Sequence, residues 1–225
     1  MILGIVGSPR KKRLTDQLVS RALEGVKAAG EETRKVYLID YEVKSYRENL
    51  KCCPDELSDL CEDADAIILG APVYFGDING LTKDFMDTVR IRNANGKYAL
   101  GIAIAGGTGK GLCSGIQSIY HFFYHRQMRG IDPTPVSRFN FNRALESLFE
   151  SGKKLAALSK KEKKPFENLW DRIEYYERLD YMNYTFLDEI MLLAKHLIEG
   201  SKLSLIHISE PTRPLYISYA VFCLK

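Results

Sequence analysis

Long apolar runs, a regular cysteine pattern and a strong charge of one sign are all missing from this chain. No stretch of eighteen apolar residues occurs, which excludes an ordinary transmembrane helix. The five cysteines, at positions 52, 53, 61, 113 and 223, lack the spacing of a secreted disulfide framework, so reduced thiols are expected. The formal net charge of +3 is too small to predict a nucleic-acid or membrane surface.

The two ends of the chain carry further expectations. Met1 is followed directly by apolar residues, without a basic leader or a cleavage site, so we expect a cytoplasmic protein. At the other end, LSLIHISEPTR (203–213) resembles the in-frame translation of a sequencing-library adapter. We therefore predict that residues 203–225 are a non-native, adapter-derived tail, and a natural amphipathic tail is the alternative.

Apolar runs alternate with helical repeats through the first 158 residues, as in α/β proteins. The predicted strands are 2–6, 34–40, 66–73, 98–106 and 131–136, and the predicted helices are 14–30, 54–63, 81–89, 111–127 and 144–158. Strands that alternate with helices form a parallel sheet covered on both sides. The expected fold class is α/β, a doubly wound five-stranded parallel sheet in the order 2-1-3-4-5.

A change in composition follows the last predicted strand and helix. Residues 159–165, SKKEKKP, form a charged run that ends in a proline, and 166–200 has an aromatic, helical pattern. We therefore predict three parts: a ligand-binding domain (1–158), a charged linker with a C-terminal helical appendage (159–202), and the adapter-derived tail (203–225).

The turn after the first strand predicts a phosphate site. In GSPRKKRLT (7–15), the hydroxyls of Ser8 and Thr15 and the guanidinium of Arg10 lie close to the start of a helix. Free N–H groups and the helix dipole favour an anion at such a place. The alternative is that Thr15 merely caps the helix while the cations are solvated, and Asp16 would repel a phosphate if it pointed inward.

Two more turns follow strands at the same edge of the predicted sheet. In the turn APVYFGDINGLTKDF (71–85), Pro72 fixes the backbone, Gly76 permits close approach, and Tyr74 and Phe75 offer aromatic rings. The turn AGGTGKG (105–111) lacks the Ser or Thr that follows the lysine of a Walker loop. Each turn alone could be a tight connection, but together they predict a site for a planar heterocycle with a phosphate tail.

These motifs carry a family resemblance over about residues 1–158. GIVGSPR, the later threonine and APVYFGDINGLTKDFMD resemble the NADPH-dependent FMN reductase and NAD(P)H oxidoreductase branch of the flavodoxin-like proteins, which includes relatives of iron–sulfur flavoproteins. The resemblance implies a flavodoxin-like fold and bound FMN with NAD(P)H as electron donor. It assigns the phosphate to Ser8, Arg10 and Thr15, and the remaining flavin contacts to Pro72, Val73, Tyr74, Phe75, Gly76, Gly106, Gly107 and Thr108.

Two departures from the family pattern stand out. Arg13 and Leu14 replace the Gly-Asn that commonly precedes the threonine, which implies a less flexible loop and weaker FMN binding. Cys52, Cys53 and Cys61 lack the compact four-cysteine spacing of the iron–sulfur relatives, so we expect ordinary thiols rather than a cluster. His121 and His125, one helical turn apart, are expected to have a surface or packing role rather than to bind a metal.

The resulting hypothesis is an FMN-dependent oxidoreductase that takes hydride from NAD(P)H and reduces a small acceptor: a quinone, a nitro or azo compound, or free flavin. A cofactor that supplies the chemistry requires no catalytic triad, and none is evident. The alternatives are a flavodoxin-type electron carrier, a receiver-type signalling domain and a flavin-free interaction scaffold. We expect a homodimer, with the 166–200 appendage as its contact rather than as a lid or a cover for the sheet.

Overall fold

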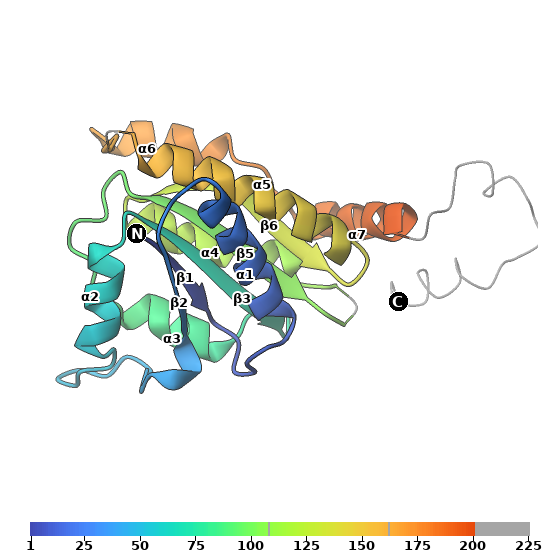
Figure 1. Ribbon diagram of the computed structural model, residues 1–225. Coiled ribbons are helices and arrows are strands. Elements are labelled where there is room, and N and C mark those ends of the chain that lie inside the picture. Colours follow the sequence, from blue (N-terminus) through green and yellow to red (C-terminus); the bar gives the residue numbers. More distant parts are fainter. Residues whose placement is uncertain (108, 162, 201–225) are drawn as a thin grey trace, which may run out of the picture.

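The computed structural model describes residues 1–107, 109–161 and 163–200. Thr108 and the predicted adapter-derived segment 203–225 therefore lie outside the described residues. In the described part, helices alternate with strands from the start of the chain (Figure 1). The strands are β1 (Ile2–Val6), β2 (Thr33–Tyr37), β3 (Ala66–Tyr74), β4 (Asp77–Ile78), β5 (Tyr98–Ala105) and β6 (Arg129–Ser137). The helices are α1 (Leu14–Ala28), α2 (Asp55–Asp63), α3 (Gly80–Thr88), α4 (Leu112–His125), α5 (Phe141–Ser159), α6 (Leu169–Glu177) and α7 (Phe186–Gly200), with a 3₁₀ helix η1 (Leu38–Asp40).

The five long strands form a parallel sheet in the order β2-β1-β3-β5-β6. Counted as parallel strands alone, this is the predicted order 2-1-3-4-5, so the flavodoxin-like fold class is confirmed. The two-residue strand β4 pairs antiparallel with the end of β3, inside the segment predicted as a turn. The second strand ends at Tyr37 rather than at the predicted residue 40, because η1 follows it directly.

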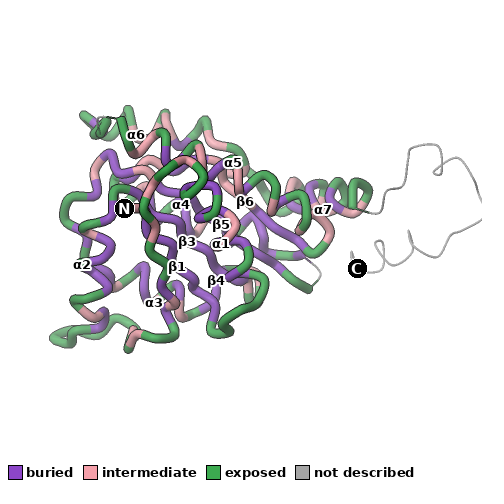
Figure 2. Tube along the Cα trace, in the orientation of Figure 1, coloured by how far each residue is buried: buried purple, intermediate pink, exposed green. Residues whose placement is uncertain are grey.

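Helices cover both faces of the sheet, and the core is divided accordingly. One apolar cluster joins β1 and β5 to α1 and α5, and the other joins the opposite face to α2, α3 and α4. Figure 2 shows that the central strands are buried along most of their length. This double burial explains why the strands read in the sequence as continuous apolar runs.

Glycines allow α1 and α5 to pack closely against each other. A Cβ on Gly25 would lie 2.0 Å from the carbonyl oxygen of Phe149, and one on Gly152 would lie 2.0 Å from that of Ala22. This close crossing fixes α1, whose N-terminus faces the carboxyl end of β1. The fold thereby positions the turn that the sequence assigns to phosphate.

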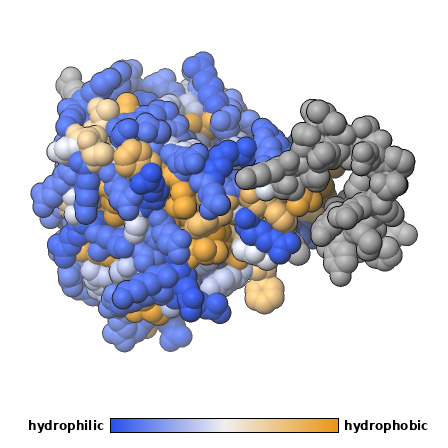
Figure 3. Space-filling model, turned by 45° about the vertical axis from the view of Figure 1, so that its right-hand side comes forward, coloured by the Kyte–Doolittle hydropathy of each residue, from blue (hydrophilic) through white to orange (hydrophobic). Residues whose placement is uncertain are grey.

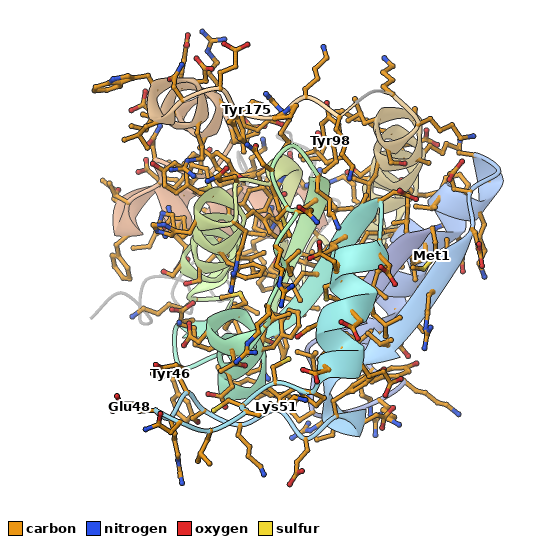
Figure 4. All side chains as sticks on the ribbon, turned by 90° about the vertical axis from the view of Figure 1, so that its left-hand side faces the viewer. Met1, Tyr46, Glu48, Lys51, Tyr98 and Tyr175 are labelled. Atoms are coloured by element: carbon orange, nitrogen blue, oxygen red, sulfur yellow. The ribbon has the colours of Figure 1, made fainter. Side chains whose placement is uncertain are left out.

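The predicted helical appendage consists of two helices that lie at different ends of the sheet. Tyr175 and Tyr176 of α6 hydrogen-bond backbone groups of Met128 and Gly130 at the start of the edge strand β6. In Figure 4, Tyr175 and Tyr98 lie at one end of the molecule, opposite Tyr46, Glu48 and Lys51. Helix α7 instead contacts the other end of the sheet, where the loops after β5 and β6 lie. None of the helices within the described residues is long and apolar enough to cross a membrane.

Candidate functional site

A pocket of about 580 Å³ opens at the carboxyl edge of the sheet, where β1, β3 and β5 end. Its size lies within the usual range for small-molecule sites, about 300–1,000 Å³. All three predicted turns contribute to it. Its lining residues are Ser8, Arg10, Lys12, Arg13, Leu14, Thr15, Gln17, Pro72, Val73, Tyr74, Ile104 and Gly106.

The start of α1 forms the end of the pocket that suits an anion. Arg13 occupies the N-cap position in an extended conformation, and no side chain caps the helix. The interpretation of Thr15 as an N-cap is therefore wrong: Thr15 is buried within the first turn and lines the pocket. The Ser8 hydroxyl accepts a hydrogen bond of 3.1 Å from the backbone N–H of Arg10, which shapes the turn. Free N–H groups at a helix N-terminus attract phosphate.

The side chains at this end add positive charge. Arg10, Lys12 and Arg13 all line the pocket, and within the described residues none of the three has an ion-pair partner. Lys11, between them, pairs instead with Asp40 outside the pocket. Three cations beside a helix N-terminus suit a phosphate monoester, which carries up to two negative charges near neutral pH.

Asp16 does not bring negative charge into this pocket. Its carboxylate accepts hydrogen bonds from Lys35 Nζ at 2.7 Å and from the Tyr37 hydroxyl at 3.1 Å, both on β2. Burial raises the pKa of the Asp16 carboxyl, but these bonds and the Lys35 charge outweigh burial and lower it overall. The carboxylate is thus neutralised by β2, and Asp16 is absent from the pocket lining.

Two buried side chains from the second turn hold the first turn in place. Asn79 Nδ2 donates a hydrogen bond of 2.9 Å to the Gly7 carbonyl, and the Thr82 hydroxyl lies 3.1 Å from the same oxygen. Thr82 also hydrogen-bonds Asn79 Oδ1 at 2.7 Å. Gly7 fits only because it lacks a side chain, since a Cβ there would lie 2.0 Å from Thr82 Oγ1. Asn79 and Thr82 were not predicted as site residues, because nothing local in the sequence marks them as partners of a residue over seventy positions away.

The wall opposite the helix is suited to a flat ring. Pro72, Val73 and Tyr74 line it, whereas Phe75 and Gly76 lie outside the lining, and Phe75 is fully exposed with a φ of 53°. Gly106 lines the pocket, but Gly107 does not. A Cβ added to either of these two glycines would have no atom within 4 Å, so the space beside the loop is open. Absent side chains here leave room for a planar group, and the residues fit FMN.

The cysteines between β2 and β3 form a separate, buried group. Cys52 Sγ accepts a hydrogen bond of 3.3 Å from the Arg47 backbone N–H, and Cys53 Sγ accepts one of 3.8 Å from Ser58. Burial raises the pKa of the Cys61 thiol to about 12. No group of three His, Cys, Asp or Glu side chains that could hold a metal ion occurs within residues 1–107, 109–161 and 163–200.

The histidine pair, His121 and His125, also lies away from this pocket. His121 and His125 lie on α4 and line a second hollow of about 520 Å³ with residues of α3. Burial lowers the pKa of His121, and the neighbouring His125 lowers it further.

Several known proteins are similar to this chain. The iron-sulfur flavoprotein MJ1083 of Methanocaldococcus jannaschii is 31% identical over 194 residues, which cover 72% of this chain and 99% of that protein. The crystal structure of the apo form of an NADH:FMN oxidoreductase, EMOB, matches with a TM-score of 0.55 and 24% identity, covering 76% of this chain and 92% of its own. A flavodoxin from the domain Archaea matches with a TM-score of 0.53 and 16% identity, covering 71% and 98% respectively. The two structural matches agree with the flavodoxin-like fold.

The described cysteines do not fit the iron–sulfur cluster in the name of the archaeal relative. A cluster is held by several cysteine thiolates that converge on it. Here Cys52 points at backbone groups of its own loop, and Cys53 and Cys61 are buried in the core with raised thiol pKa values. The pocket at the carboxyl edge of the sheet is independent of these thiols, because none of them lines it.

The pocket, the fold and a family match agree with one another. The three turns meet at one pocket, the charge of the pocket suits a phosphate, and the fold is flavodoxin-like. A model of the NADPH-dependent FMN reductase family matches residues 1–137, which include all three turns. The chain therefore belongs to the NADPH-dependent FMN reductase family of FMN-binding oxidoreductases.

Proposed function

We propose that this protein is an FMN-dependent oxidoreductase that takes hydride from NAD(P)H and reduces a small acceptor: a quinone, a nitro or azo compound, or free flavin. The observation that carries the proposal is the single pocket that joins a cationic helix N-terminus to an open, glycine-bordered wall. Both ends of FMN, its phosphate and its ring, thereby find a matching environment.

The chain's own residues would bind and orient the cofactor. Ser8, Arg10 and Thr15 would hold the phosphate together with the N–H groups at the start of α1. Pro72, Val73 and Tyr74 would border the ribityl chain and ring, and the loop from Gly106 would pass along the other edge. When bound, FMN supplies the chemistry by accepting a hydride and passing electrons to the acceptor.

Exposure at the mouth of the pocket supports a reaction with two small molecules in turn. Tyr74 is 43% exposed, and Phe75 beside it is fully exposed. Gly106 and Gly107 are exposed as well. A mouth of this kind leaves one side of a bound ring accessible, first to a nicotinamide and then to an acceptor of similar flat shape.

Absorption spectra of the purified chain, before and after incubation with FMN, test the proposal. We expect a bound-flavin band in the visible range, which bleaches when NADPH or NADH is added without oxygen and returns when a quinone is added. A Gly106→Val variant is the matched control, because Gly106 lines the pocket and an added Cβ there would have no atom of another residue within 4 Å. A bound flavin that neither nucleotide bleaches would favour an electron carrier, and a chain that never binds flavin would favour a scaffold.

The outer face of α7 supports a homodimer as the second part of the proposal. Leu187, Met191, Ala194 and Ile198 are exposed and spaced by four, three and four residues. Because this spacing reads the same in both directions, an antiparallel second copy would set Leu187 against Ile198 and Met191 against Ala194. Figure 3 shows apolar surface at this end of the molecule. Light scattering should give a dimer mass for the native chain and a monomer mass for Met191→Lys, and a native monomer would refute the contact.

A further inference from the structure

A buried carboxylate of α7 lies at the N-terminus of α4. Glu189 is only 3% exposed, although it belongs to one of the last helices of the described chain. Its Oε1 accepts a hydrogen bond of 2.8 Å from the Gly111 N–H, and its Oε2 accepts one of 2.8 Å from the Cys113 N–H. The two oxygens thus satisfy two of the N–H groups that the start of α4 leaves without helical partners. No side chain of α4 itself does so.

The residues that Glu189 holds belong to the glycine loop beside the pocket. Gly111 is the N-cap of α4, with a φ of 88°. A Cβ on Gly111 would lie 2.4 Å from the Cα of Gly76, so the glycine loop packs directly against the second turn. Holding Gly111 therefore fixes the distance between the two loops that border the ring end of the pocket.

Two more contacts join α7 to the same loop. A Cβ on Gly109 would lie 2.3 Å from a methyl carbon of Leu193, which places that leucine against the loop backbone. The Lys110 ammonium lies 4.9 Å from the centre of the Phe186 ring. Consecutive loop residues 109, 110 and 111 are thus each contacted by a different residue of α7. Gly106 and Gly107 differ from these residues, because an added Cβ at either position would have no atom of another residue within 4 Å.

We infer that Glu189 is a positioning residue of the flavin site, because it anchors the glycine loop through the N-terminus of α4. Helix α7 thereby helps to hold the ring end of that site in place. The inference rests on the proposed function insofar as it concerns FMN. The carboxylate acts on the ring end of the pocket only. The phosphate end is held by Asn79 and Thr82, which Glu189 does not contact.

This separation between the two ends gives the inference a specific signature. Riboflavin carries the same ring as FMN but no phosphate. If Glu189 fixes the loop beside the ring, its loss weakens the binding of both flavins by the same factor. A change that acted through the phosphate end would weaken FMN binding and leave riboflavin binding as it was.

The experiment compares Glu189→Ala and Glu189→Gln in the full chain, with Glu199→Gln as the matched control. Glu199 lies on the same helix, but it is exposed at the surface and pairs with Arg143. Fluorescence quenching gives the dissociation constants of FMN and riboflavin, and hydrogen exchange reports the amides of Gly111 and Cys113. We expect Glu189→Ala to raise both constants at least about tenfold, as for the loss of a charged buried hydrogen-bond acceptor. We expect Glu189→Gln to lie between Glu189→Ala and the native chain, and Glu199→Gln to bind as the native chain does.

The outcomes separate this inference from the proposed function. Native-like binding of both flavins by a folded Glu189→Ala or Glu189→Gln variant would overturn the inference, as would a loss confined to FMN. Glu189→Gln keeps the shape of the side chain, so it provides the test if the alanine variant does not fold. If the native chain binds neither flavin, the proposed function fails. Unchanged exchange at Gly111 and Cys113 in the variants would then reject the anchoring role by itself.

Discussion

Acidification from pH 7 to pH 5 should destabilise the folded chain, because of the buried His196. This side chain is 4% exposed. Its Nδ1 lies 3.1 Å from Ser137 Oγ, and its Nε2 lies 3.2 Å from Asn140 Nδ2. Asn140 Oδ1 accepts from the Ser137 N–H, so its Nδ2 is a donor and Nε2 of the histidine must accept. A proton on Nε2 would face another donor, and the neutral ring is required.

The size of the effect follows from the pKa of His196. The pKa of His196 is lowered from 6.5 to about 4, chiefly by burial; the positive charges of Arg143 and Lys195 contribute to the lowering, and Glu199 opposes it. Protonation of His196 is therefore less favourable in the folded state than in the unfolded chain. The stabilisation is complete above pH 6.5 and is lost as the pH falls towards 4. At about 1.4 kcal/mol per pKa unit the full effect is about 3 kcal/mol, of which about 2 kcal/mol is lost between pH 7 and pH 5.

Urea unfolding at pH 7, 6 and 5 measures this loss against a His196→Asn variant. The amide cannot titrate, but it keeps a polar group near Ser137. The native chain should lose about 2 kcal/mol more unfolding free energy than the variant between pH 7 and pH 5. His121, whose pKa is also lowered by burial, is present in both proteins, so its contribution cancels in the difference. Equal losses in the two proteins would refute the argument that His196 must stay neutral.

Three further predictions concern the pocket. Gly7→Ala should lower the unfolding free energy by about 1–3 kcal/mol in urea, because its Cβ would lie 2.0 Å from Thr82 Oγ1, whereas Gly80→Ala, with open space around its Cβ, should not. Arg10→Ala should raise the dissociation constant of FMN about tenfold or more and leave that of riboflavin unchanged, since only FMN carries the phosphate; an equal rise for both would contradict its role. Gly106→Val should abolish FMN binding with an unchanged melting temperature, and a tightly bound flavin in this variant would show that the ring lies elsewhere.

The sequence predicted the sheet and the convergence of its turns for a physical reason. Strands that are buried on both faces appear as apolar runs, and parallel strands bring their carboxyl ends to one edge. The register agrees with this, because Val6 pairs with Gly70 and Pro72 pairs with Ile104. The turns at 7–15, 71–85 and 105–111 therefore had to meet once the strand order was known. Ser8, Arg10, Thr15, Pro72, Val73, Tyr74 and Gly106 all line the resulting pocket.

The supporting contacts could not be predicted in the same way. Asn79 and Glu189 act on backbone groups 72 and 78 positions away, and no local pattern indicates such a partner. Glu189 is a charged residue within an amphipathic helix, which by itself predicts a solvated side chain. The division of 166–200 into two helices at opposite ends of the sheet was missed for the same reason. The helical period indicates which face of a helix is apolar, but not the part of the fold that it covers.

The two ends of the pocket are held by chain segments of different kinds, which separates their energetics. The phosphate end depends on residues 7–15 and on two side chains at the start of α3, all within the part of the chain that matches the family. The glycine loop at the ring end is held by Glu189 and Leu193, which lie beyond that part. A ligand that binds only when the loop is in place must stabilise α7 to the same extent that α7 strengthens binding, because the coupling is reciprocal. Bound flavin should therefore shift the acid destabilisation caused by His196 to lower pH, whereas inorganic phosphate at the other end should not.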